Sequence, residues 1–175
     1  MTAITIHALN PGDLDAHADA LAGIMAETVS DGAAIGYMQP FSPADGLAFF
    51  MGQVFPEVRA GRRRLLVAML DGVPAGSVQL ITSLPPNQPH RCEVAKMMVA
   101  PAARRKGIGR ALMRAVDAEA VAAGKSLITL DTRTGDRAEP LYRAAGFRIA
   151  GVIPGFALDP DGRALHATTY MYKTL

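Results

Sequence analysis

The first part of the chain passes from strand-like alternation to helical spacing of its apolar side chains. Apolar and polar residues alternate over 2–9, which predicts a strand. Apolar residues recur at helical spacing over 14–29, which predicts a helix, and the glycines and prolines of 30–43 predict a loop. Ser42, with an aspartate three residues later, can cap a second helix, which we expect to run to about Arg59.

The rest of the chain alternates apolar runs with two helical patterns. From Ile108 the apolar positions repeat every four residues, which predicts a helix that packs one stripe against a sheet. In chain order we expect strands over 65–69 and 75–82 joined by a turn at 71–72, a strand over 93–99, a helix from 108 to 123–124, a strand over 127–130, a helix over 136–145, and strands over 147–152 and 168–172. The segment 154–166 is predicted to be a loop. Together these elements predict an α/β (α+β) fold in which a mixed sheet carries helices on both faces.

Length and composition narrow the class of protein. At 175 residues the chain has the length of one domain, so we expect residues 1–175 to form a single unit. A hydrophobic share of 50% and a charged share of 19% are typical of a soluble protein. No apolar stretch is long enough to span a bilayer, and residues 1–10 do not resemble a signal peptide, so no membrane partner is expected. A net charge of +2 is too small to favour nucleic acid, and the single cysteine, Cys92, suits a reducing cytoplasm.

The most informative motif lies between the strand over 93–99 and the helix that follows it. Gly107 and Gly109 flank one aliphatic residue at the expected helix start, where unpaired N–H groups attract phosphate and glycines let it approach. Positive charge is concentrated at the same place, on Arg104, Arg105, Lys106 and Arg110. This pattern indicates a diphosphate site. It is not a P-loop, because no Gly-Lys-Ser or Gly-Lys-Thr occurs, and it is not the dinucleotide fingerprint, because Leu112 stands where that motif needs glycine.

The pattern Arg-x-x-Gly-x-Gly, formed by Arg104, Gly107 and Gly109, resembles the acetyl-CoA-binding motif of the GNAT superfamily of N-acetyltransferases. Residues 94–99 resemble the central strand of that family, and 138–147 resemble its A-x-x-x-Y-x-x-x-G-F segment, in matching order. The resemblance implies a mostly antiparallel sheet whose central parallel strands splay apart, with acetyl-CoA as co-substrate between them. The segments 91–96, 130–135 and 154–169 further resemble the tabtoxin-resistance branch, which implies an amino-acid-like acceptor and a link to antibiotic or toxin resistance.

Three residues are candidates for the chemistry of acyl transfer. Tyr142 has the register of the family tyrosine that protonates the departing thiolate, and the alternative is a half-buried helix aromatic. Glu93 and Asp131 are candidates for binding or deprotonating the substrate amine. The alternatives are an ion pair of Glu93 with Arg91 or Lys96, and a turn-forming role for Asp131.

The resemblance implies a set of cofactor-binding positions along the motif and the two central strands. They are Met97, Met98, Val99, Arg104, Arg105, Lys106, Gly107, Ile108, Gly109, Arg110, Thr132, Ala138 and Tyr142. A backbone N–H at Met98 or Val99 is expected to stabilise the thioester oxygen, and the two methionines to face opposite sides of the sheet. Gly135 stands where the family often has asparagine, which leaves Thr132, Thr134 or Asp136 to supply that contact.

Cys92 is expected to be a small buried hydrophobe, and the histidines show no metal-ligand spacing, so no metal is expected. The leading hypothesis is an acetyl-CoA-dependent N-acetyltransferase that moves the acetyl group directly to the primary amine of a small amino-acid-like molecule. The alternatives are a protein or peptide N-acetyltransferase and a non-catalytic acyl-CoA-sensing module. A small-molecule amine is the expected partner, and a homodimer is possible.

Overall fold

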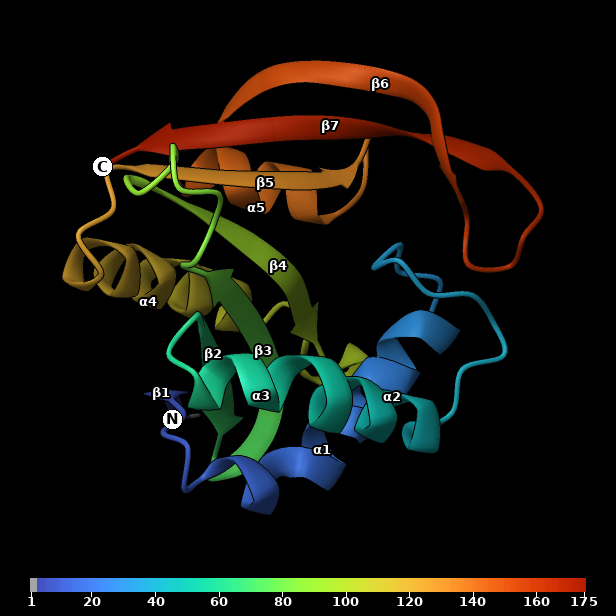
Figure 1. Cartoon of the computed structure of the whole chain (residues 1–175). Coiled ribbons are helices and arrows are strands. Elements are labelled where there is room, and N and C mark those ends of the chain that lie inside the picture. Colours follow the sequence, from blue (N-terminus) through green and yellow to red (C-terminus); the bar gives the residue numbers. More distant parts are fainter. Residues whose placement is uncertain (1–2) are drawn as a thin grey trace.

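A seven-stranded sheet runs through the protein in the order β1-β2-β3-β4-β5-β7-β6. The structure, a computed structural model, describes residues 3–175 (Figure 1). The strands are β1 (Ile4–Ala8), β2 (Arg63–Leu70), β3 (Val73–Ile81), β4 (Arg91–Val99), β5 (Leu127–Arg133), β6 (Arg148–Leu158) and β7 (Leu165–Thr174). Neighbouring strands are antiparallel except β4 and β5, which are parallel. The predicted mixed, mostly antiparallel sheet is therefore confirmed.

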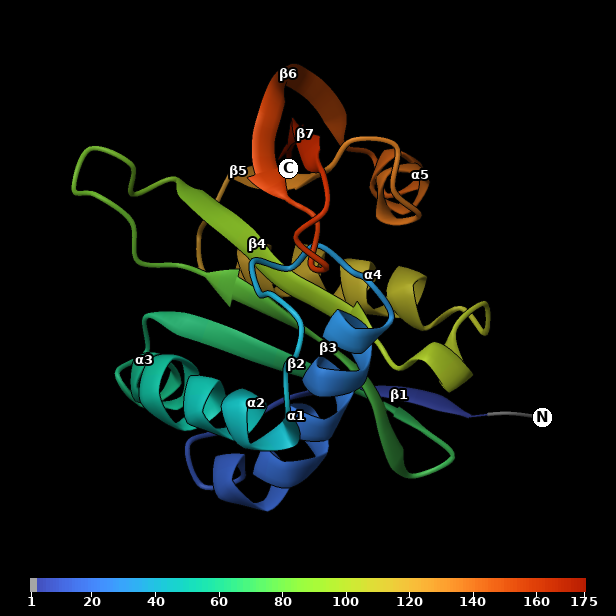
Figure 2. The same ribbon diagram turned by 90° about the vertical axis from the view of Figure 1, so that its right-hand side faces the viewer.

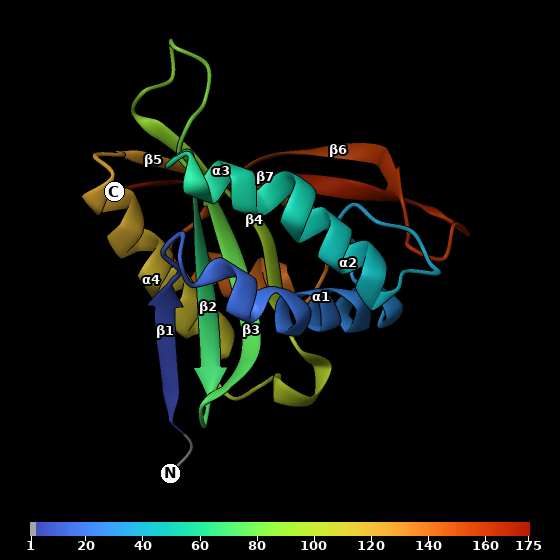
Figure 3. The same ribbon diagram turned by 60° about the horizontal axis from the view of Figure 1, so that its bottom comes forward.

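Helices cover both faces of the sheet, as predicted. They are α1 (Leu14–Ser30), α2 (Pro43–Phe49), α3 (Phe55–Arg59), α4 (Ile108–Ala122) and α5 (Ala138–Ala144), with a π-helical turn at Phe50–Val54 and a 3₁₀ turn at Pro101–Ala103. Figure 3 shows α1, α2 and α3 crossing one face of β2, β3 and β4, with α4 behind these strands. Two cores result, one packed against α1–α3 and one against α4 and α5. Met98 belongs to the first core and Met97 packs against the second, so these side chains face opposite sides, as expected.

The two parallel strands diverge soon after they begin to pair. Their register joins Arg91–Glu93 to Leu127–Thr129, and no later residue of β4 is paired with β5 in the described part of the chain. Figure 2 shows β5, β7 and β6 separating from β4 with α5 beside them. The backbone N–H and C=O groups of β4 beyond Glu93 that face β5 are therefore free to bind a ligand. This divergence confirms the predicted splay.

Strand β4 also contains a bulge. Ser77 of β3 lies opposite Met98, whereas Gln79 lies opposite Ala95, so one extra residue is inserted into β4 between these pairs. Lys96 lies in this bulge with φ of 49°, a left-handed conformation that few lysines adopt. The bulge changes the direction in which the Lys96 side chain leaves the strand.

One predicted element was wrong, and one differs in detail. The segment 154–166 is mostly strand, because β6 continues to Leu158 and β7 begins at Leu165. Pro154 is tolerated there because β6 is an edge strand, and an irregularity between Ile153 and Ala157 accommodates it. The helix expected up to Arg59 is interrupted by the π-helical turn, because Pro56 has no backbone N–H to continue the α-helical ladder.

Candidate active site

A cleft of about 1400 Å³ opens where β4 and β5 diverge. Its walls come from the loop after α1, from β4, from the start of α4, from the end of β5 and from α5. The predicted residues that line it are Glu93, Met97, Met98, Val99, Arg104, Arg105, Gly107, Ile108, Gly109, Arg110, Asp131, Thr132, Ala138 and Tyr142. Lys106, the remaining candidate, is exposed and lies outside this lining.

The N-terminus of α4 presents free backbone donors to this cleft. Gly107 is the N-cap residue with φ of 90°, and it provides no capping side chain for the first-turn N–H groups. Arg105 also has a positive φ, of 62°, so the chain turns sharply before the helix. Such a turn followed by an uncapped helix start binds diphosphates. The residues present therefore fit a diphosphate such as that of acetyl-CoA, and Arg105 and Arg110 line the cleft at this helix start.

Gly109 has a structural role in addition to the one expected. A Cβ atom at this position would lie 2.8 Å from Cδ2 of Leu141 on α5. That distance is too short for any real contact, so the missing side chain allows α4 and α5 to pack closely. Because α5 also carries Tyr142, the close packing at Gly109 positions that residue.

Arg104 is engaged with the protein itself. Its Nε donates to the Val99 carbonyl at 3.3 Å, and its guanidinium forms an ion pair with Asp31. The hydrogen bond from Arg104 holds the pKa of the Asp31 carboxyl below its usual range. Arg104 therefore joins the end of α1 to the segment before α4, and sequence reasoning missed Asp31 because it is distant along the chain.

Tyr142 is buried within α5, with only 5% of its surface exposed, and lines the cleft. Its ring packs against Phe147 at 6.1 Å between centroids. Burial raises the pKa of its phenol far above the usual value, and the charges of Asp136 and Asp131 raise it further. The phenol therefore keeps its proton over the whole neutral and alkaline range in which enzymes work.

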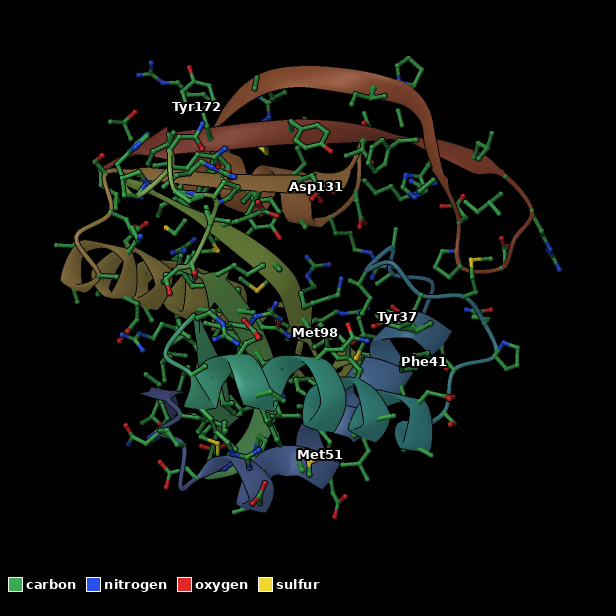
Figure 4. The ribbon with its side chains drawn as sticks, viewed as in Figure 1. Tyr37, Phe41, Met51, Met98, Asp131 and Tyr172 are labelled. Atoms are coloured by element: carbon green, nitrogen blue, oxygen red, sulfur yellow. The ribbon has the colours of Figure 1, made fainter. Side chains whose placement is uncertain are left out.

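Glu93 and Asp131 both line the main cleft and an adjoining cavity of about 590 Å³. Glu93 forms the ion pair with Arg91 that was its alternative interpretation, with 3.2 Å between Oε2 and Nη1. Asp131 lies inside β5, which extends to Arg133, and it is paired with Tyr170 of β7. The turn-forming alternative for Asp131 is therefore wrong. Figure 4 shows Asp131 on β5, separated from Met98 on β4 after the two strands have diverged.

Some cleft residues were not predicted. Arg63 of β2, Gln79 of β3 and Lys96 of β4 line the cleft together with Gly36 of the loop after α1. Lys96 is a lysine inside an otherwise apolar strand, and this was the one sequence signal that could have indicated a functional residue. The bulge that directs its side chain cannot be predicted from the sequence. Arg63 and Gln79 reach the cleft only through the register of three strands.

Tyr37 and Phe41 pack together rather than lining the cleft. Their ring centroids are 4.9 Å apart, and Tyr37 also packs edge-on against Phe49 at 5.5 Å (Figure 4). They fasten the loop after α1 to the helices below it.

Cys92 is fully buried, and its Sγ lies 3.8 Å from the Leu127 carbonyl. Burial raises its pKa to about 11, so the thiol is not ionised near neutral pH and does not serve as a nucleophile. Within residues 3–175 no group of three or more His, Cys, Asp or Glu side chains is arranged to hold a metal ion. In the same range, every helix is too short or too polar to cross a bilayer.

Comparison with known proteins relates this geometry to a family. The model of the acetyltransferase (GNAT) family matches residues 23–147. An uncharacterized N-acetyltransferase of Azospirillum brasilense, encoded in the hisH-hisA intergenic region, is 35% identical over 146 residues, which cover 80% of this chain and 82% of that protein.

Solved structures show the same fold. The yncA protein of Salmonella typhimurium, solved with its cofactor acetyl-CoA, matches with a TM-score of 0.78 and 21% identity, covering 99% of this chain and 94% of its own. A phosphinothricin acetyltransferase of Sinorhizobium meliloti, in complex with acetyl-CoA, matches with a TM-score of 0.79 and 22% identity, covering 98% and 88%. The family match spans more than half of the chain. The acetyl-CoA bound in the two solved structures carries a diphosphate, which agrees with the uncapped start of α4. The chain therefore belongs to the GNAT family of acetyltransferases, acyltransferases that take their acetyl group from acetyl-CoA.

Proposed function

We propose that this protein acetylates the primary amine of a small amino-acid-like molecule by direct transfer from acetyl-CoA. The observation that carries the proposal is the shared cleft, which joins the uncapped start of α4, the buried phenol of Tyr142 and the carboxylate of Asp131. The resemblance of the C-terminal segment to the tabtoxin-resistance branch supports an amino-acid-like acceptor. So does the structural neighbour named as a phosphinothricin acetyltransferase.

Acetyl-CoA supplies the activated acetyl group when it is bound. Asp131 accepts the proton of the substrate ammonium, directly or through a water molecule, so that the amine nitrogen can form its bond to the acetyl carbon. The C–S bond breaks in the same exchange, and Tyr142 donates its phenolic proton to the departing thiolate. The nitrogen loses its second proton as the amide forms, and this proton returns through solvent to the Tyr142 phenolate, while Asp131 releases the first proton to solvent. Glu93, held by Arg91, contributes a fixed negative charge beside the amine.

The backbone of β4 favours Val99 over Met98 as the donor to the thioester oxygen. The N–H of Ala100 donates to the Ala75 carbonyl of β3 at 2.9 Å. Because alternate N–H groups of a strand point the same way, the N–H of Met98 also faces β3 and that of Val99 faces the divergence from β5. An N–H in that position is free to stabilise the developing oxyanion.

The first test is release of free thiol from acetyl-CoA with a panel of amino acids, β-lactam amino acids, aminoglycosides, polyamines and short peptides. Turnover confined to the amino-acid classes is the expected result. Turnover with peptides alone would favour the protein or peptide N-acetyltransferase. CoA binding by calorimetry without turnover of any acceptor would favour the acyl-CoA-sensing module.

Replacing Asp131 by asparagine is expected to lower kcat/KM for the amine by about 10²- to 10⁴-fold at neutral pH, the usual range for a lost general base. The deficit should shrink as the pH rises toward the pKa of the free amine, because the amine then arrives without its extra proton. Steady-state kinetics from pH 6 to about 10 measure both effects. Asp19→Asn, an exposed change on α1, is the matched control. A deficit that is the same at every pH would show that Asp131 only positions the substrate.

The homodimer stays a prediction. Strand β6 forms one edge of the sheet and exposes Ile149, Val152 and Ile153, so its free backbone groups could pair with a strand of a second copy. Sedimentation equilibrium would test this.

A further inference from the structure

Two positively charged side chains of the cleft, away from the start of α4, form no direct ion pair. Arg63, at the start of β2, and Lys96, in the bulge of β4, are both only partly exposed and line the cleft. Neither forms an ion pair with a carboxylate among residues 3–175. A desolvated charge without a partner is costly for a folded protein, so its presence indicates a ligand of opposite charge.

The register of the sheet brings these residues together. Arg63 pairs with Ile81 of β3, which pairs in turn with Glu93 of β4, so Arg63 and Glu93 belong to the same row of the sheet. Two rows along, Gln79 lies opposite Ala95, the residue before the bulge. The Arg63 guanidinium donates from Nη1 to Oε1 of the fully buried Gln79 at 2.6 Å, which fixes its position.

This corner of the cleft has more hydrogen-bond donors than acceptors. Arg63 Nε and Gln79 Nε2 are buried without a hydrogen-bond partner within residues 3–175. Lys96 adds its ammonium group beside them, and the positive charge of Arg63 is close enough to lower the pKa of Lys96, after the larger effect of burial. Those two buried nitrogens do not reach the cleft themselves, but the partly exposed remainder of the Arg63 guanidinium and the Lys96 ammonium group can bind the oxygens of an incoming oxyanion.

Lys96 is held in place by the loop after α1. Its Nζ lies 5.7 Å from the centre of the Tyr37 ring, in a cation–π contact. A Cβ atom on Gly36 would lie 3.5 Å from the same nitrogen, so the loop passes directly beside it. The ammonium group therefore stays in the cleft near Asp131, whose charge favours the protonated lysine.

We propose that Arg63 and Lys96 bind the carboxylate of the acceptor, or an equivalent compact oxyanion, while Asp131 binds its amine. This inference rests on the proposed function, because it gives the acceptor an amine and an anionic group on one small molecule. The cations and Asp131 line the same cleft, and Asp131 is close enough to Lys96 for the two charges to interact, so one small zwitterion can be paired at both ends. Monoamines and polyamines lack the anion and would leave both cations without a partner.

The test compares matched pairs of L-amino acids and their carboxamides as acceptors, with the full chain and saturating acetyl-CoA. The wild type is expected to prefer the acids by at least about tenfold in kcat/KM, the size of one good charge-assisted contact. Lys96→Met and Arg63→Gln should each lower kcat/KM for the acids by about 10- to 100-fold and leave the carboxamides nearly unchanged. Lys96→Arg, which keeps the charge, should retain most of the preference, and the exposed Arg114→Gln on α4 is the matched control.

Several outcomes would overturn the assignment. They are equal loss for acids and carboxamides, a wild-type preference for carboxamides, or weaker CoA binding in the Lys96→Met variant, which would place the two cations on the donor instead. Folding of each variant is checked by thermal unfolding.

A second measurement separates this inference from the proposed function. Calorimetry of N-acetyl-amino acids binding to the CoA-loaded protein requires no turnover. Weaker binding to Lys96→Met than to the wild type would support the anion site even if no acceptor in the panel were acetylated. Identical binding to both would reject the anion site even if amino acids were acetylated.

Discussion

Replacing Tyr142 by phenylalanine is expected to lower kcat by about 10²- to 10⁴-fold, the range typical of a lost general acid. The variant should bind CoA as the wild type does, because phenylalanine fills the same buried space against Phe147. The physical reason for the loss is the protonation state of the phenol. Burial keeps the phenol protonated, so it has a proton to donate at the moment when the thiolate leaves. Thiol-release kinetics and calorimetric CoA binding measure the two quantities.

The pH dependence of the wild type, compared with that of Tyr142→Phe, tests the raised pKa of the phenol. Because the pKa of Tyr142 is raised, we expect no loss of wild-type activity from its ionisation near pH 10, where an ordinary tyrosine titrates. Tyr172→Phe on β7 is the matched control (Figure 4). A wild-type inflection near pH 10 that disappears in Tyr142→Phe would contradict the buried phenol, and an unchanged kcat would remove Tyr142 from the acid role.

Gly109→Glu is expected to abolish measurable CoA binding. The new side chain begins 2.8 Å from Cδ2 of Leu141, so Leu141 must shift, and its carboxylate adds negative charge to the first turn that the diphosphate needs. Both effects act against the cofactor, and the shift of Leu141 disturbs the packing of α5, which also carries Tyr142. Calorimetry with CoA and thermal unfolding would measure the loss of binding and the extent of repacking.

A pair of smaller substitutions separates the two effects. Gly109→Ala introduces no charge but creates the same contact, so we expect weaker CoA binding and lower thermal stability. The double variant Gly109→Ala with Leu141→Ala removes the contact and should recover part of both. If Gly109→Ala bound CoA normally, the charge rather than the packing would be the cause of the loss in Gly109→Glu.

Local patterns were sufficient to predict most of the fold. The hairpin of β2 and β3 and the amphipathic α4 follow from apolar spacing and turn residues that lie within a few positions of one another, whereas the splay of β4 from β5 was implied only by the resemblance to the family. The errors came from prolines whose effect depends on their surroundings. Pro154 lies in the segment predicted to be a loop, yet an edge strand tolerates it. Pro56 lies in the helix predicted to run to about Arg59, and a π-helical turn precedes it.

The residues of the candidate site also fall into two groups, those that could be named from sequence and those that could not. The diphosphate motif is contiguous, so its residues could be named from sequence, and nearly all of them line the cleft. Arg63 and Gln79 could not be named, because they reach the cleft only through the pairing of β2 with β3 and of β3 with β4. The direction of Lys96 depends on a bulge that has no glycine to mark it.

The burial of Cys92 has a practical consequence at the bench. It is the chain's single cysteine, it is fully buried, and its thiol stays protonated at neutral pH. A chromogenic disulfide reagent added to the folded protein will therefore react with released CoA and give almost no background from the enzyme. The same reagent without acetyl-CoA will colour only as chains unfold, one thiol per chain, so a single chemistry reports both turnover and the rate at which the native structure opens.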